Sequence, residues 1–117
     1  MKSFLIIFLL SSFSEAYTQP FLGKWTGTVR GSNGSLGSEM NLKYNASKTQ
    51  ISGEMIVNNG GARDYYSLNA TVNQSSAKGT LKYKDGTVFM LEMTIAAGSL
   101  TQKISYNNQL ILQGDYQ

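Results

Sequence analysis

Apolar and polar residues alternate along most of the chain beyond residue 20, and no stretch shows the spacing of an amphipathic helix. Alternation with a period of two is typical of β-strands that bury one face. Clusters of Gly, Asn, Asp and Ser interrupt the alternation at short intervals, and such residues favour turns. The pattern predicts eight strands, over residues 22–30, 36–44, 49–57, 65–73, 77–84, 87–96, 99–106 and 109–116.

The segments between the predicted strands are short. Asp85–Gly86 predicts a tight type I′ hairpin, because both residue types accept positive φ, and Asn107–Asn108 is similar. The longest loops are expected at 31–37 and 58–64. Short connections make neighbouring strands antiparallel, so we expect an up-and-down strand order.

Eight strands in this order can close into a barrel or stack as two sheets. Closure removes both exposed sheet edges. Glycines inside strands favour it, because they let strands coil and bend sharply. The glycines within the predicted strands are Gly23, Gly27, Gly53, Gly79 and Gly114. We therefore expect an all-β fold, an eight-stranded antiparallel barrel, with a sandwich as the alternative.

The alternation also assigns each residue to a face of the barrel. The predicted outer face holds the charges: Lys24, Arg30, Glu39, Lys43, Glu54, Lys78, Lys82, Glu92, Lys103 and Asp115. The predicted inner face is apolar and aromatic: Trp25, Val29, Leu36, Met40, Leu42, Tyr44, Ile51, Met55, Val57, Tyr66, Leu68, Val72, Leu81, Tyr83, Phe89, Leu91, Met93, Ile95, Leu100, Ile104, Tyr106, Leu110, Leu112 and Tyr116. Three apolar residues fall on the outer face instead: Val88, Met90 and Ile111.

Residues 1–16 have the pattern of a cleavable signal peptide. Lys2 precedes an apolar run over residues 4–10, which is too short to span a bilayer, and Ser14 and Ala16 form a small-x-small cleavage pattern. We therefore expect a secreted or periplasmic protein whose single domain covers residues 17–117. No Cys follows the apolar run, so we expect no lipid or membrane anchor.

Composition narrows the classes of function. The chain contains no Cys, so the fold must be stable without disulfides, and no His, the commonest general base and metal ligand. The net charge of +3 comes from scattered basic residues, whereas nucleic-acid binding needs a dense basic patch. We expect no metal, no cofactor and no nucleic-acid partner.

The stretch "LGKWTG", residues 22–27, resembles the G-x-W signature on the first strand of the calycins. This barrel superfamily includes lipocalins, fatty-acid-binding proteins and avidins. The resemblance implies that Gly23 lets the chain enter the first strand closely and that Trp25 packs across the closed base of the barrel. It also implies a ligand-binding barrel, and the predicted signal peptide suits a lipocalin-like protein.

A candidate binding site follows from strand direction. If the first strand starts at the base, then Tyr66, Tyr83 and Tyr106 lie near the open end and point inward. Their rings would contact an apolar ligand and their hydroxyls its polar group. Arg63, in a predicted loop at that end, would meet an anionic group, and Asn58 and Asn59 would add hydrogen bonds.

Stability limits the size of this site. An empty cavity of about 300 Å³ would cost about 7 kcal/mol, which is comparable to the whole stability of a small domain. We therefore expect the interior to be filled or only shallowly open.

Two other functions remain alternatives. A filled barrel could act on a protein, for example as a secreted hydrolase or protease inhibitor whose N-terminal arm, residues 17–20, enters the enzyme. Catalysis is not expected, because no predicted inner position carries a carboxylate and no paired carboxylates or nucleophile motif is present.

Overall fold

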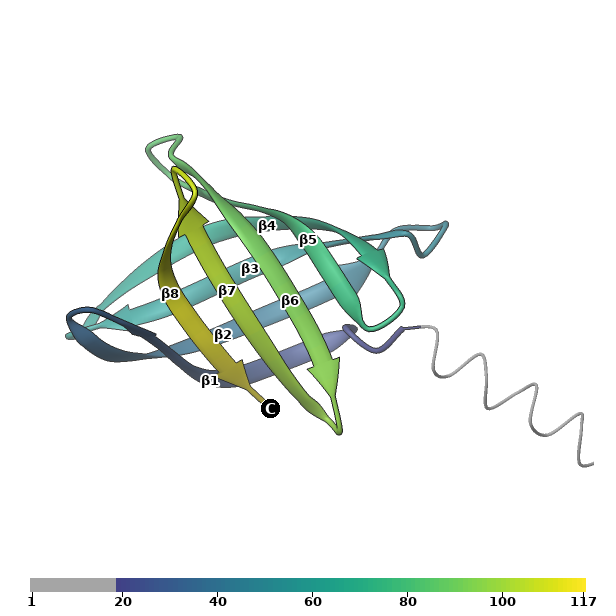
Figure 1. The fold of residues 1–117 in the computed structure, drawn as a ribbon, viewed down its shortest axis with the longest axis horizontal. Helices are drawn as coiled ribbons and strands as arrows, with labels where there is room; N and C mark the ends of the chain where they lie inside the picture. The colour runs from purple at the N-terminus through teal and green to yellow at the C-terminus, as the bar shows by residue number, and fades with distance from the viewer. Residues whose placement is uncertain (1–18) are drawn as a thin grey trace, which may run out of the picture.

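The computed structural model describes residues 19–117, so the predicted signal peptide lies outside the described residues. The described chain forms eight β-strands (Figure 1). They are β1 (Gly23–Gly31), β2 (Gly34–Tyr44), β3 (Gln50–Asn59), β4 (Ala62–Asn73), β5 (Ser76–Tyr83), β6 (Val88–Ala96), β7 (Ser99–Tyr106) and β8 (Gln109–Tyr116). Between residues 19 and 117 there is no helix long and apolar enough to cross a membrane.

The strands close into one antiparallel barrel in sequence order, which confirms the predicted up-and-down barrel and excludes the sandwich. The seam between β1 and β8 is short: it pairs Gly27–Arg30 with Gln113–Tyr116, and Thr26 and Gln117 exchange two backbone hydrogen bonds of 2.9 Å at its end. Beyond this seam the β1–β2 hairpin diverges from β8 (Figure 1). The barrel is therefore tightly closed at one end and opens between these two elements at the other.

Glycines inside the strands permit close contact between neighbouring strands. A Cβ atom added at Gly27, Gly53 or Gly79 would overlap a carbonyl oxygen of the adjacent strand. For Gly79 this oxygen belongs to Asn69 on β4. A side chain at these positions would push the strands apart, and sharp coiling of the strands is what closes a barrel of this size.

Two loops predicted to be long are in fact tight turns. Strands β3 and β4 continue up to Gly60 and Gly61, whose φ angles of 57° and 90° suit a two-residue hairpin. Only residues 32 and 33 separate β1 from β2. Paired glycines and polar residues favour loops, but here they mark the ends of strands that extend into the turn.

The turn chemistry of the other hairpins was partly predicted. Asn107 and Asn108 both have positive φ, as expected for a type I′ turn. The type I′ prediction for Asp85–Gly86 is wrong, because only Gly86 has positive φ. The Asp85 carboxylate instead accepts a hydrogen bond from the backbone N–H of Thr87 at 2.9 Å, and this bond lowers the pKa of Asp85.

The predicted inner face forms the core, with three exceptions near the open end: Leu110, Tyr106 and the half-buried Tyr83. Leu110 is 51% exposed and Tyr106 is 44% exposed. A β-bulge explains Leu110: Ile104 pairs with Leu112, but Ser105 pairs with Leu110, so Ile111 has no partner on β7. The extra residue turns Leu110 to the outer face.

The closed end is filled by a residue that the sequence did not single out. Phe21, just before β1, is fully buried in the core. Its carbonyl oxygen accepts a hydrogen bond from Trp25 Nε1 at 2.9 Å, and its backbone N–H donates to the Tyr44 hydroxyl at 3.0 Å. Trp25 lies at the base as the calycin resemblance implies, but it is only half-buried; it holds Phe21, which is the actual plug.

Candidate functional site

The open end of the barrel carries a half-enclosed groove of about 400 Å³. It lies between the β1–β2 hairpin and β8, where the seam has ended. Apolar side chains line it from within, and polar groups surround its rim. The lining residues are Val29, Gly31, Ser32, Asn33, Gly34, Leu36, Asn59, Ile111 and Leu112.

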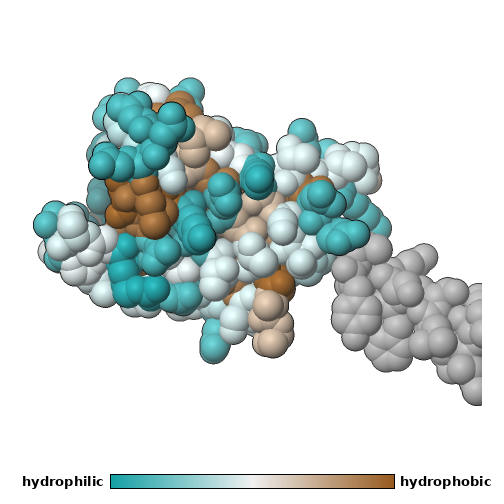
Figure 2. Space-filling model, viewed as in Figure 1, coloured by the Kyte–Doolittle hydropathy of each residue, from teal (hydrophilic) through white to brown (hydrophobic). Residues whose placement is uncertain are grey.

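The groove is a consequence of the short seam and the bulge. Gly31 continues β1 past the last pair with β8, and a Cβ there would lie 2.8 Å from the Leu112 side chain. Leu112 therefore packs against bare backbone. The unpaired Ile111 forms the neighbouring wall. Figure 2 shows a hydrophobic patch on this side of the barrel, between the β1–β2 hairpin and the β7–β8 hairpin.

Beneath the groove the interior is almost full. A cavity of about 20 Å³ lies among Met55, Val57, Tyr66, Leu81, Phe89, Ile104, Ile111 and Leu112. This is room for about one water molecule. Ile111 and Leu112 line both spaces, so these two side chains separate the groove from the interior. The filled interior agrees with the limit that stability sets on an empty pocket.

The three predicted tyrosines lie in one row of aromatic rings at the open end. Ring centroids are 5.1 Å apart between Tyr66 and Tyr83, 6.1 Å between Tyr66 and Phe89, and 5.5 Å between Phe89 and Tyr106. Phe89 was assigned to the inner face but not to the site, and it connects the tyrosines. Tyr66 and Phe89 reach the small cavity, whereas Tyr83 and Tyr106 stand nearer the rim.

A carboxylate also faces the inside of this end, contrary to the prediction that the carboxylates stay off the apolar face. Asp64 lies within β4, directly opposite the buried Val57 of β3, so the two residues share a face. Its Oδ1 atom accepts a hydrogen bond from the Tyr83 hydroxyl at 3.0 Å. Asp64 falls within the predicted loop over residues 58–64, whereas β4 begins at Ala62 and includes it.

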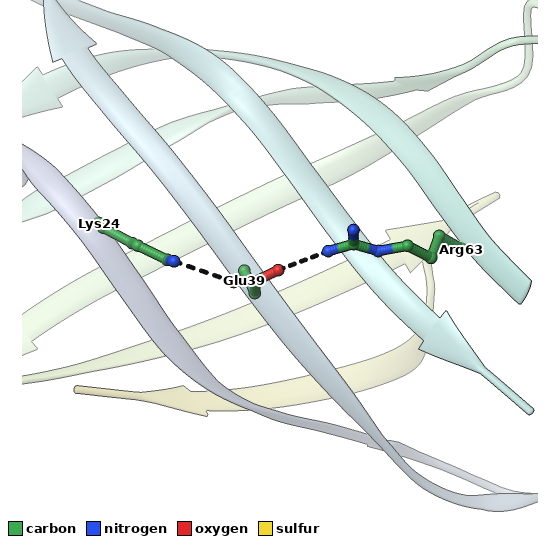
Figure 3. Close-up of polar contacts among 3 residues, drawn as sticks. All are labelled: Lys24, Glu39 and Arg63. Atoms are coloured by element: carbon green, nitrogen blue, oxygen red, sulfur yellow. Dashed lines mark hydrogen bonds and ion pairs between the residues drawn. The ribbon is translucent and has the colours of Figure 1, made fainter. Parts of the chain in front are cut away.

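Arg63 and Asn58, two of the predicted site residues, do not line the groove. Arg63 belongs to β4 and pairs with Asn58 across the strands; both are exposed on the outer face. The Arg63 guanidinium donates to Glu39 at 2.8 Å, and Lys24 approaches the other oxygen of Glu39 at 3.2 Å (Figure 3). Extending β4 by three residues reversed the expected orientation of residues 63 and 64.

Asn59, at the end of β3, lines the groove. Sequence reasoning missed the groove residues of the β1–β2 turn, Ser32 and Asn33, although it expected a loop there. It also assigned Leu36 and Leu112 to the inner face without placing them at the mouth. Strand pairing supplies that missing information, since it shows where the seam ends.

Burial and nearby carboxylates raise the pKa of one tyrosine of the row, Tyr66. Desolvation raises the pKa of the Tyr66 hydroxyl, and the negative charges of Asp64 and Asp85 raise it further. Tyr66 thus stays a neutral hydrogen-bond donor in a negative environment. Within the described part of the chain, no three acidic side chains cluster as metal ligands would.

Comparisons with solved structures show the same fold. A redesigned beta barrel matches with a TM-score of 0.73 at 11% identity, over 86% of this chain and 93% of that one. A de novo designed fluorescence-activating beta barrel matches with a TM-score of 0.68 at 14% identity, over 86% and 94%. The structure of EF1p2_mFAP2b bound to DFHBI matches with a TM-score of 0.66 at 12% identity, over 86% and 95%. No protein-family model and no curated protein matches the chain.

Proposed function

We propose that this protein is an exported β-barrel that binds a small apolar or amphipathic ligand in the groove at its open end. The observation that carries the proposal is the asymmetry of the barrel. One end is plugged by Phe21, whereas the other holds a groove of about 400 Å³ with an apolar floor and a polar rim. Small-molecule sites typically have this size and this mixture of walls. Hollows of about 320 Å³ and 370 Å³ also lie beside the C-terminal end of β8 and on the outer wall of β1–β3, but neither shares a wall residue with the interior cavity, as the open-end groove does.

Two further observations support the proposal. A barrel of the same fold can bind a small molecule, since one similar structure was solved bound to DFHBI. The "LGKWTG" stretch resembles the opening of the calycins, many of which are ligand carriers. The groove is shallow, so we infer that the ligand lies at the mouth, with its apolar part against Leu36, Ile111 and Leu112.

The test is binding of N-phenyl-1-naphthylamine, an uncharged aromatic probe whose fluorescence rises in apolar surroundings. Ile111→Ser replaces a groove wall at an unpaired, 38% exposed position and should weaken binding several-fold. Because Ile111 also lines the small interior cavity, urea unfolding of the variant checks that the fold is retained. Val88→Ser is the matched control, because Val88 is a β-branched residue, 46% exposed on the outer face. Equal affinity of both variants, or no binding by the native protein, would contradict the proposal.

The proposal that the protein is exported rests on the signal-peptide pattern of residues 1–16. We propose that cleavage leaves a domain that starts at Tyr17. The test is the intact mass of the protein recovered outside the cytoplasm of its host. A mass that still includes residues 1–16 would contradict cleavage.

A protein-binding barrel is the second candidate function. Val88, Met90 and Leu110 are exposed on the outer faces of β6 and β8, and Ser105 of β7 pairs with both Met90 and Leu110. Such neighbouring apolar side chains occur at protein contacts. Under this alternative Val88→Ser, not Ile111→Ser, weakens function, so the two variants above separate the candidates.

A further inference from the structure

We propose that the ligand of the open-end groove carries a positive charge, and that Asp64 together with the surrounding aromatic rings recognises its ammonium group. The inference rests on the proposed function, because it names the chemical class of the ligand that the groove takes. It reverses the expectation from the sequence, in which Arg63 would receive an anion.

The position of Asp64 supplies the first argument. Its carboxylate is on the inner face of β4, opposite Val57, which lines the small cavity. Asn59, two residues further along the same face of β3, lines the groove. Asp64 itself lines neither space, but it lies on the strand next to Val57 and Asn59, which line the small cavity and the groove respectively. One oxygen accepts the Tyr83 hydroxyl, which fixes the carboxylate, and within residues 19–117 no Lys or Arg forms an ion pair with it.

The aromatic row supplies the second argument. The negative face of an aromatic ring attracts cations, and Tyr66, Tyr83, Phe89 and Tyr106 present several rings within one continuous cluster. The protein already uses one of them in this way, since Lys84 Nζ lies 5.6 Å from the centroid of the Tyr83 ring. A carboxylate combined with aromatic rings is the chemistry that binds organic ammonium groups.

The distribution of the other charges supplies the third argument. Arg63 and Lys24 are held on the outer wall by Glu39, and Arg30 is paired there with Asp115. Asp85 adds a second negative charge near Tyr66, as the raised pKa of Tyr66 reflects. Lys84 is the cation near the row, and it is exposed on a turn. An anion at the mouth would therefore meet two carboxylates and one exposed lysine, a balance that favours a cation.

The experiment compares three ligands that share one alkyl chain: octylammonium, 1-octanol and octanoate. Each displaces N-phenyl-1-naphthylamine at pH 7, and calorimetry of the same ligands checks binding without the reporter. We expect octylammonium to bind roughly fivefold to tenfold more tightly than 1-octanol, and octanoate to bind most weakly. Asp64→Asn keeps an oxygen that can accept the Tyr83 hydroxyl and removes the charge, so it should abolish the preference for octylammonium.

Glu54→Gln is the control for net charge, because it removes one negative charge from an exposed position on the outer face of β3. It should leave the preference for octylammonium intact. Equal binding of octylammonium and 1-octanol by the native protein, tighter binding of octanoate, or equal effects of Asp64→Asn and Glu54→Gln would overturn the inference while leaving the proposed function standing. Absence of binding by all three ligands and the probe would overturn both.

Discussion

The Tyr116 hydroxyl donates a hydrogen bond to Oε1 of Gln102 at 2.9 Å in the centre of the barrel, where both side chains are fully buried. The same hydroxyl accepts a hydrogen bond from Ser38 at 2.8 Å. The amide nitrogen of Gln102 in turn points to the sulfur atoms of Met40 and Met55, at 3.4 and 3.6 Å. The chain of contacts links β2, β3, β7 and β8, and among the described residues no buried side-chain polar atom lacks a partner. A satisfied network of this kind specifies one arrangement of the strands.

Tyr116→Phe should destabilise the barrel by about 1–3 kcal/mol, because it leaves the Ser38 hydroxyl and Oε1 of Gln102 without a partner in the core. Urea unfolding followed by circular dichroism measures the change. Tyr65→Phe is the matched control, since Tyr65 is 45% exposed, and it should change stability very little. Equal effects of the two variants would show that the network contributes nothing to stability.

The stability of the native protein should fall as the pH rises from about 10 to about 12. Burial penalises the phenolate and raises the pKa of Tyr116 from 10.0 to about 12, although the Ser38 hydrogen bond lowers it slightly. The unfolded chain releases this proton near pH 10, so the contribution is complete below that pH and is lost as the pH rises through the pKa of the folded state. It amounts to about 2–3 kcal/mol.

Urea unfolding of the native protein and of Tyr116→Phe at several pH values isolates this effect. The lysines and the other tyrosines titrate in both proteins, so the difference between the two curves belongs to Tyr116. We expect the native protein to lose stability more steeply in alkali. Parallel curves would contradict the buried, neutral state of this hydroxyl.

Phe21→Ala should cost about 3–5 kcal/mol, because it removes the buried plug from the closed end. Since Trp25 is the only tryptophan and donates its indole N–H to the Phe21 carbonyl, its fluorescence should shift to longer wavelength as water enters. The neighbouring Leu22→Ala is the control: Leu22 is exposed, and its loss should leave both the emission and the stability nearly unchanged. An unshifted spectrum in Phe21→Ala would contradict the plug.

Gly79→Ala should destabilise the barrel by about 1–3 kcal/mol, since the new Cβ would overlap the backbone of Asn69 and force β4 and β5 apart. Gly37→Ala is a fitting comparison within a strand of the same barrel, because the nearest atom to its Cβ would be Asn58 Nδ2 at 3.6 Å, an ordinary contact. Gly37→Ala should leave the stability of the barrel nearly unchanged. Thermal unfolding of both variants measures the difference, and a destabilised Gly37→Ala with an unaffected Gly79→Ala would contradict the role of close strand approach in closure.

The sequence alone predicted the eight strands, their order and most of the inner face, because these depend on local patterns. Alternation with a period of two assigns a residue to a face wherever a strand is regular, and Gly or Asn at a turn forces the chain back on itself. Trp25 and Tyr66 were placed at the correct ends for this reason. The pattern failed where one residue changes the register: the bulge at Ile111 exposes Leu110, and the extension of β4 directs Asp64 inward and Arg63 outward.

Only the tertiary structure decided where the barrel is open and what its mouth contains. The groove exists because β1 and β8, the first and last strands, pair over a short segment, and no local pattern encodes the length of a pairing between the two ends of the chain. The polar core is similar, since Ser38, Gln102 and Tyr116 come from strands far apart in sequence and satisfy one another only after the barrel closes. Closure is a long-range event, and it determines both the polar network and the place where the barrel is open.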